Sequence, residues 1–309
     1  MSLAHTLEAA LVAGIAGVTR RTPRRTALAI GSGLGALLGR LGIRANVARQ
    51  NLALAFPERS PEEREAILRA HYRELGRVAG EYPSMPELVR APQGEVVVGV
   101  AGIEHLERAQ REGRGVLLLT GHFGNFELLG AWLGRMNPVD FVVKPLSNPR
   151  VDRWLSDLRR RSGVGQIPLG AGVRGIYRAL RANRWVALLG DQDARRAGVF
   201  VPFFGRPTST PRGPADLALR TGAPLIMGFP TRLPDGRHQL EVEPPLAMPD
   251  RRGEEAVIEI TARHAARLEA WVRARPDHWL WLHRRWKTTP RPQAIASPGP
   301  EPVAADGGR

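Results

Sequence analysis

An alternation of short aliphatic runs with amphipathic stretches, between residues 93 and 274, most constrains the fold of this chain. Strands that alternate with helices are typical of α/β domains, in which crossover helices cover the faces of the sheet. We therefore predict an α/β fold with a central mixed, largely parallel sheet flanked by helices. The expected strands are "EVVVGV" (95–100), "GVLLLT" (115–120), "DFVVK" (140–144), "WVALLG" (185–190), "PLIMGF" (224–229) and "QLEVE" (239–243). The expected helices lie near 103–112, 126–136, 150–161, 173–183, 213–221 and 253–274.

A helical segment precedes this alternation. Residues 45–82 predict two helices around a turn, and "ERSPEE" marks the start of the second, with Ser60 as N-cap and Pro61 at the first helical position. The Pro/Gly/Ala-rich end of the chain predicts disorder. We expect an N-terminal docking segment (1–44), an α/β domain (45–289) and a disordered tail (290–309).

The first 50 residues are both apolar and basic. They contain seven arginines and a single acidic residue, Glu8, around the apolar stretches 9–18 and 27–39. Neither stretch reaches the roughly 18 to 20 apolar residues of a spanning helix. Short apolar helices with arginines between them favour docking on an anionic membrane surface. The alternative is two small core helices joined by a solvated loop.

The stretch "ALAIGSGLGA" contains G-x-G-x-x-A at 31–36, a pattern typical of dinucleotide-binding turns. Such a site needs an acidic residue about 20 positions further on to hold the ribose. No Asp or Glu occurs between Gly31 and Pro57. We therefore reject a dinucleotide site and expect these glycines to permit close helix packing or to lie in the membrane interface.

Composition narrows the function classes. The net charge of +15 favours a polyanionic partner, and the aromatic content of only 6% argues against a single-stranded nucleic acid binder. The absence of cysteine excludes disulfides, a thiolate nucleophile and Cys-ligated zinc.

The stretch "LLTGHFGNFELLG" (118–130) holds the strongest candidate for catalysis. His122 follows a predicted strand at the edge of the sheet where sites form in α/β folds. On one helix, five positions would put His122 and Glu127 about 140° apart, so His122 must lie in the turn to meet Glu127. Glu127 would then orient the ring and His122 would act as a base. The alternative is a turn histidine beside an acid that stabilises a helix N-terminus.

Several blocks together carry a family resemblance. "HFGNFE" resembles the H-x4-D/E block of the lysophospholipid acyltransferase superfamily. "NLALAFPERSPEEREAI" (51–67), "KPLSNPRVDRWLSDLR" (144–159), "GDQDARRAGVFVPFFGRPTSTPRGPADLALRTGAPL" (190–225) and "HWLWLHRRWKTTP" (278–290) resemble blocks of its lipid A (lauroyl and myristoyl) late acyltransferase branch. The resemblance covers roughly residues 20–290.

The resemblance implies acyl transfer from a thioester, on acyl carrier protein or CoA, to a hydroxyl of a glycolipid acceptor. It implies His122 and Glu127 as catalytic base and orienting partner, and no cofactor, metal or nucleic acid partner. It also implies a peripheral or monotopic location on the cytoplasmic face of the bacterial inner membrane. The oxyanion donors would be backbone N–H groups of the turn after His122.

We assign substrate contacts to five further residues. Lys144 stands where the family usually has Arg, so it keeps the positive charge without the bidentate fork. Asp191 and Asp193 end another strand, and we expect them at the same mouth as His122. For His283 with its neighbouring arginines, phosphate binding, lining of the cleft and capping of the sheet all remain open. The five residues are Asn125, Lys144, Asp191, Asp193 and Arg284.

Three alternatives remain at this level. The acceptor could be another lipid, such as a mannosylated phosphoinositide or a lysophospholipid. The chain could be a basic protein that binds anionic lipid or nucleic acid without catalysis. His122 and Glu127 with the two aspartates could form a metal site of a hydrolase.

Overall fold

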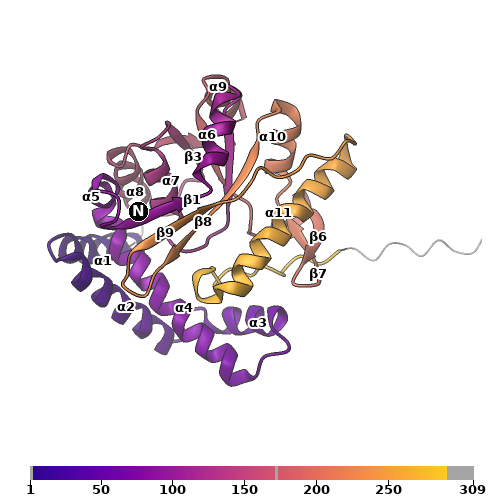
Figure 1. The fold of residues 1–309 in the computed structure, drawn as a ribbon. Helices are drawn as coiled ribbons and strands as arrows, with labels where there is room; N and C mark the ends of the chain where they lie inside the picture. The colour runs from indigo at the N-terminus through magenta and orange to yellow at the C-terminus, as the bar shows by residue number, and fades with distance from the viewer. Residues whose placement is uncertain (1–2, 171–172, 291–309) are drawn as a thin grey trace, which may run out of the picture.

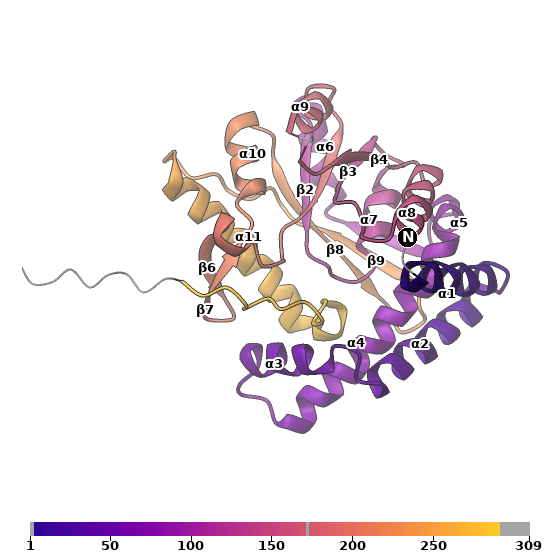
Figure 2. The same ribbon diagram turned by 180° about the vertical axis from the view of Figure 1, so that it is seen from behind.

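The computed structural model describes residues 3–170 and 173–290. The predicted disordered tail lies outside these residues except for Pro290. Figures 1 and 2 show a central sheet with helices packed on it, and the first four helices gathered at one end of the molecule.

The central sheet has the strand order β1-β9-β8-β2-β5-β3-β4. All neighbouring strands run parallel except β8 and β9, so the predicted mixed, largely parallel sheet is confirmed. A separate antiparallel hairpin, β6–β7, was not predicted, and neither was the edge strand β4. The strands are β1 (Val97–Ala101), β2 (Val116–Thr120), β3 (Val139–Val143), β4 (Gly165–Pro168), β5 (Trp185–Leu189), β6 (Val199–Phe203), β7 (Arg206–Thr210), β8 (Leu225–Arg232) and β9 (His238–Val242).

The helices lie close to their predicted positions, with α5 as an addition. They are α1 (Leu3–Arg20), α2 (Arg24–Arg40), α3 (Ala45–Ala55), α4 (Pro61–Glu81), α5 (Met85–Arg90), α6 (Ile103–Arg111), α7 (Phe126–Leu133), α8 (Pro149–Arg161), α9 (Val173–Arg181), α10 (Gly213–Thr221) and α11 (Glu254–Ala274). Short 3₁₀ turns lie at η1 (Tyr82–Ser84), η2 (Arg195–Ala197) and η3 (Pro276–His278).

Strand β2 lies in the middle of the core and is buried on both faces. Leu117 and Leu119 pack into one hydrophobic cluster, with α3, α4 and α9 to α11, while Val116 and Leu118 pack into another, with α5 to α8. Successive side chains of a strand point to opposite faces, so a strand covered on both sides needs a continuous aliphatic run. This requirement explains why residues 116–119 of "GVLLLT" are all aliphatic.

The predicted start of α4 is confirmed as a capping box. The Ser60 hydroxyl accepts a hydrogen bond from the Glu63 N–H, the Glu63 carboxylate accepts one from the Ser60 N–H, and Pro61 occupies the first turn. These bonds satisfy backbone donors that would otherwise lack partners at the helix start.

The glycines of the rejected dinucleotide pattern serve helix packing, as expected. A Cβ on Gly31 would lie 2.2 Å from the Gly76 carbonyl oxygen, and one on Gly35 would lie 1.9 Å from that of Tyr72. The backbones of α2 and α4 therefore touch, which only residues without a side chain allow. This contact joins α2 to the rest of the chain across the boundary predicted at residue 44.

The two apolar stretches of the N-terminus form α1 and α2. In the part of the chain that the structure describes, no helix alone has the length and apolar character to cross a membrane; α2 and α3 together do, but with an 89° bend between them. Several aliphatic side chains of this region are largely exposed, including Leu7, Leu11, Leu37 and Leu41.

We predict opposite effects for two alanine substitutions in α2. Gly31→Ala drives a methyl group into the backbone of α4 and should destabilise the fold by about 1–3 kcal/mol. Gly33→Ala places its methyl group in open space and should stabilise the fold by about 0.5–1 kcal/mol. Urea unfolding midpoints measure both, and equal midpoints would contradict the close contact.

Candidate active site

His122 lies in the turn between β2 and α7, as predicted, and the C-terminal segment holds this turn in place. Gly124 adopts a φ of 51° and donates its N–H to the His278 carbonyl at 2.8 Å, while Phe123 pairs with Trp279. A Cβ on Gly124 would lie 2.4 Å from the Pro230 carbonyl oxygen, so the turn requires glycine there.

The register of two neighbouring strands brings His122 to Asp191. Thr120 of β2 lies opposite Leu189 of β5, and Gly190 donates its N–H to the Thr120 carbonyl. Because the strands are parallel, the residues two positions further on in each strand also meet. Asp191 therefore lies beside His122, as predicted, but it is 3% exposed and lines neither of the two cavities that meet at His122, so the structure gives no support to its predicted contact with substrate.

Asp191 holds both the ring and the backbone of His122. Its Oδ1 lies 2.8 Å from His122 Nδ1, and its Oδ2 accepts the His122 N–H at 2.8 Å and the indole N–H of Trp279 at 2.9 Å. A carboxylate can only accept, so Nδ1 carries the proton and Nε2 keeps its lone pair. Nε2 lies 3.4 Å from the amide nitrogen of Gln192.

The predicted hydrogen bond between His122 and Glu127 is wrong. Glu127 is buried in the first turn of α7 and accepts a forked pair from Arg159 of α8, with its oxygens 3.1 and 3.0 Å from Arg159 Nε. The spacing of five residues brings Glu127 near His122 but points it at another helix. The ring partner comes instead from the neighbouring strand.

The electrostatics follow from these contacts. Burial lowers the pKa of His122, but the Asp191 carboxylate, with a smaller contribution from Glu127, raises it, and the net result is a raised pKa. Burial alone would raise the pKa of Asp191; the His122 ring and backbone and Trp279 lower it to about 2. Asp191 therefore makes the ring of His122 a stronger base than its burial alone would allow.

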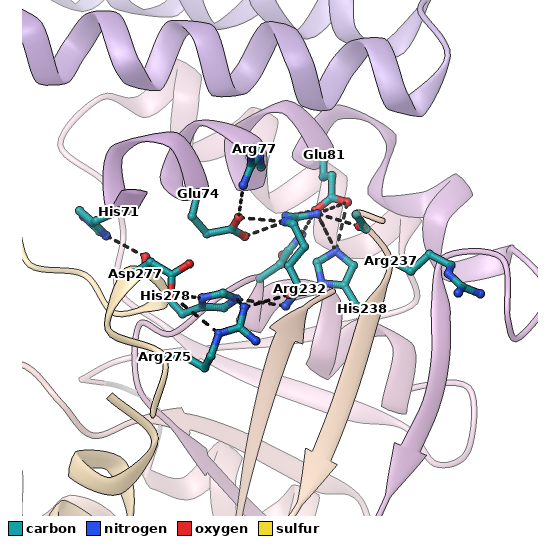
Figure 3. Close-up of polar contacts among 12 residues, drawn as sticks. His71, Glu74, Arg77, Glu81, Arg232, Arg237, His238, Arg275, Asp277 and His278 are labelled. Atoms are coloured by element: carbon teal, nitrogen blue, oxygen red, sulfur yellow. Dashed lines mark hydrogen bonds and ion pairs between the residues drawn. The ribbon is translucent and has the colours of Figure 1, made fainter. Parts of the chain in front are cut away.

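A buried polar network around Glu81 joins α4 to β8 and β9 (Figure 3). The Glu81 carboxylate accepts hydrogen bonds from Arg232 at 2.8 Å and from the Asn125 side chain at 3.1 Å, and lies 3.0 Å from the His238 ring. Asn125 in turn caps α7 by accepting the Leu128 N–H. Asn125 is 1% exposed and both ends of its amide are used, so the structure gives no support to its predicted contact with substrate.

Two cavities meet at His122, whose side chain is 22% exposed. The first has a volume of about 440 Å³ and a mostly apolar wall under α1, with Val12, Ile15 and Ala16 on one side and Val78, Phe126 and Trp154 on the others. The second has a volume of about 760 Å³ and a mixed wall that includes Lys144, Gln192 and Arg220. We call them the apolar cavity and the polar cavity.

The remaining predicted residues separate into two groups. Lys144 and Asp193 line the polar cavity, together with Glu127 and Arg159. Arg284 is exposed and lines neither cavity. His283 accepts the Asp193 N–H through Nε2 at 3.2 Å, so it holds the β5 loop in place.

Two of the backbone N–H groups predicted as oxyanion donors are used elsewhere. The Phe123 N–H donates to the Gly121 carbonyl, and the Gly124 N–H donates to His278. Four residues of the site were not predicted: Glu81, Arg159, Gln192 and Trp279. Gln192 carried a signal, because it stands between the two aspartates at the end of a predicted strand, and Arg159 and Trp279 lie in blocks that carry the resemblance. Across residues 3–170 and 173–290, no three histidine or carboxylate side chains are placed to hold a metal ion.

Comparison with known proteins identifies the chain. The profile of the bacterial lipid A biosynthesis acyltransferase family matches residues 1–288. The lipid A biosynthesis lauroyltransferase of Escherichia coli is 31% identical over 292 residues, which are 92% of either chain. The chain belongs to the bacterial lipid A biosynthesis acyltransferase family. It is thus an acyltransferase, and the resemblance found in the sequence is confirmed.

Other relatives of this acyltransferase are named for different acyl chains and acceptors. The palmitoleoyltransferase of Escherichia coli is 30% identical over 251 residues, 80% of each chain. A phosphatidylinositol mannoside acyltransferase of Mycobacterium tuberculosis is 33% identical over 248 residues, 77% of this chain and 76% of that one. The solved structure of PlsC, a 1-acyl-sn-glycerophosphate acyltransferase from Thermotoga maritima, is 13% identical and matches 75% of this chain and 99% of its own chain, with a TM-score of 0.35.

The His122–Asp191 pair predicts a shift in the pH dependence of the acyltransferase. In the wild type, kcat/KM should rise with pH as His122 loses its proton at its raised pKa. Asp191→Asn removes the largest raising influence and leaves the burial that lowers the pKa. The midpoint should therefore move to lower pH, while the plateau falls by at least about 10²-fold. A pH–rate profile with an unmoved midpoint would contradict this pairing.

Proposed function

We propose that this protein transfers a fatty acyl chain from an acyl thioester to a hydroxyl of a lipid A-type glycolipid, with His122 as general base and Asp191 as its orienting partner. The observation that carries this proposal is the position of His122, with Nδ1 held by Asp191, at the junction of an apolar and a polar cavity. A base between two such environments suits a reaction whose substrates are an acyl chain and a polar headgroup.

The proton transfers of this reaction balance, with His122 first accepting and then returning the proton. Nε2 takes the proton of the acceptor hydroxyl as its oxygen attacks the thioester carbonyl, and Asp191 stabilises the imidazolium that forms. The tetrahedral intermediate collapses to an ester and expels the thiolate. The imidazolium returns its proton to the thiolate, which leaves as a thiol, and His122 is neutral again.

The apolar cavity is the proposed chamber for the acyl chain. Its wall is formed largely by aliphatic and aromatic side chains, and it reaches His122 directly. Apolar cavities of this size bind ligands by removing apolar surface from water.

The polar cavity is the proposed chamber for the acceptor headgroup. Lys144 and Arg220 line it and can attract phosphate groups, although Lys144 supplies a point charge without a fork. Arg159 lies in the same wall and is fixed by Glu127. The proposed role of Glu127 is thus to hold this arginine and to help raise the pKa of His122.

The helices of residues 1–44 are the proposed membrane-docking segment. Val12 and Ile15 of α1 line the apolar cavity, while Leu7 and Leu11 are 62% and 65% exposed on the outside. A helix with apolar side chains on both sides needs a cover for its outer face. Nearby arginines make an anionic bilayer the suitable cover, on the cytoplasmic face of a bacterial inner membrane.

A second acceptor class is supported by the relatives. The mycobacterial phosphatidylinositol mannoside acyltransferase is about as similar to this chain as the lauroyltransferase is. Lipid A and phosphatidylinositol mannosides are both glycolipids, so product analysis must include both classes.

The direct test uses purified wild type and His122→Ala with acyl thioesters and either lipid A precursors or phosphatidylinositol mannosides. Mass spectrometry should show one added acyl group with the wild type and at least about a 10²-fold lower rate with the variant. His105→Ala, on α6 away from both cavities, serves as the control and should keep full activity. Equal rates for His122→Ala and the wild type would remove His122 from the mechanism.

A substitution on α1 tests whether the apolar cavity holds the acyl chain. Ala16→Phe fills the apolar cavity and should lower kcat/KM for long acyl donors more than for short ones. The matched control is Ala13→Phe, at an exposed position of the same helix, which should leave the chain-length preference unchanged. An unchanged preference in Ala16→Phe would place the acyl chain elsewhere.

A further inference from the structure

Helix α9 presents a stripe of three exposed arginines. Arg174, Arg178 and Arg181 stand at spacings of four and three residues, which puts them on one face of the helix. The opposite face is buried in the core through Ile176 and Leu180. The charges are therefore fixed to a rigid, packed element.

The stripe lacks compensating acids. In the described part of the chain, no carboxylate lies within 4.0 Å of these three guanidinium groups. By contrast, Arg212 beside α10 pairs with both Asp216 and Glu254. Like charges one turn apart repel one another, so an anionic partner would relieve a strain in the free protein.

The position of α9 connects the stripe to the site. Val173 and Tyr177 of α9 line the polar cavity, as does Arg220 of α10, and His122 lies in the same cavity. Arg174 follows Val173 at the start of the helix, and Arg178 follows Tyr177, so two of the three arginines are next in sequence to residues of this wall.

Figures 1 and 2 place α9 and α10 at the opposite end of the molecule from α1 and α2. If α1 and α2 lie on the membrane, the α9 stripe faces away from the bilayer. This placement favours a soluble anionic partner over a lipid headgroup.

We infer that the α9 stripe is the docking surface for an acidic carrier protein that delivers the acyl thioester, an inference that rests on the proposed function. A carrier holds its thioester at the end of a flexible arm, which would enter the polar cavity between α9 and α10 and reach His122. The acceptor would approach from the side of Lys144 and α8, which contacts α1 through Asn148 and Glu8.

Docking by charge has a kinetic signature. Complementary charges speed association by about 10 to 10³-fold at low salt, and ions screen them over about 10 Å at 0.1 M. The effect should appear in the KM for the carrier-bound donor and should weaken with added salt. The chemical step at His122 should not change.

The experiment compares the wild type with Arg174→Glu/Arg178→Glu/Arg181→Glu on three donors: acyl carrier protein thioester, acyl-CoA and acyl-pantetheine. The KM for the carrier donor should rise at least about tenfold at low salt. With acyl-pantetheine, the kcat/KM of the triple variant should stay within about twofold of the wild-type value. This result would also show that the variant is folded. The charge-matched control replaces Arg69, Arg73 and Arg206, exposed arginines far from α9, with Glu, and should behave as the wild type.

Each outcome decides one question. A triple variant with an unchanged KM for the carrier donor overturns the docking surface. An equal loss with acyl-CoA would mean that the stripe binds the nucleotide, and this too overturns the carrier assignment. A wild type that transfers no acyl group from any donor would overturn the proposed function itself.

Discussion

The buried carboxylate of Glu81 is the interaction on which the arrangement of this protein depends. Its partners come from separate elements: Arg24 at the start of α2, Arg232 at the end of β8, His238 of β9 and the cap of α7, Asn125. A buried charge costs several kcal/mol unless it is paired, so these elements must assemble together. The ion pairs and hydrogen bonds outweigh the burial, and the pKa of Glu81 lies well below its usual value. The N-terminal helices and the His122 turn are therefore coupled through one side chain.

The site places the ring of His122 between two environments. On the side of α1, mostly apolar side chains line one cavity. On the other side, cations, carboxylates and the Gln192 amide lie among aliphatic side chains in the second cavity. The ring of His122 can serve both because Asp191 fixes its Nδ1 and leaves Nε2 at the junction. Helix α1 connects this chemistry to the surface, because its inner face lines the chamber and its outer face is apolar and exposed. In the proposed function, docking on a membrane and the shape of the acyl chamber would both depend on this helix.

The arginine excess has more than one physical role. Arg232 and Arg285 are buried and serve the fold: Arg285 is 2% exposed, donates to the Ser209 carbonyl and the Thr210 hydroxyl, and has a pKa lowered by burial to about 10. Arg159 serves the wall of the polar cavity. Only the remaining arginines, such as those on α9, are available to a partner. Net charge alone therefore overstates the binding surface, because it counts structural and surface arginines equally.

The sequence by itself determined the core strands, most helices, the α4 cap and the place of His122, because aliphatic runs, helical spacing and capping residues are local signals. It missed β4, β6 and β7, whose short segments contain Gly or Pro and gain their strand form from neighbours. Only the tertiary structure decided that Asp191, and not Glu127, holds His122. That choice depends on the register of β2 against β5. The register brings together residues about seventy positions apart, and the spacing of residues along the chain does not predict such a contact.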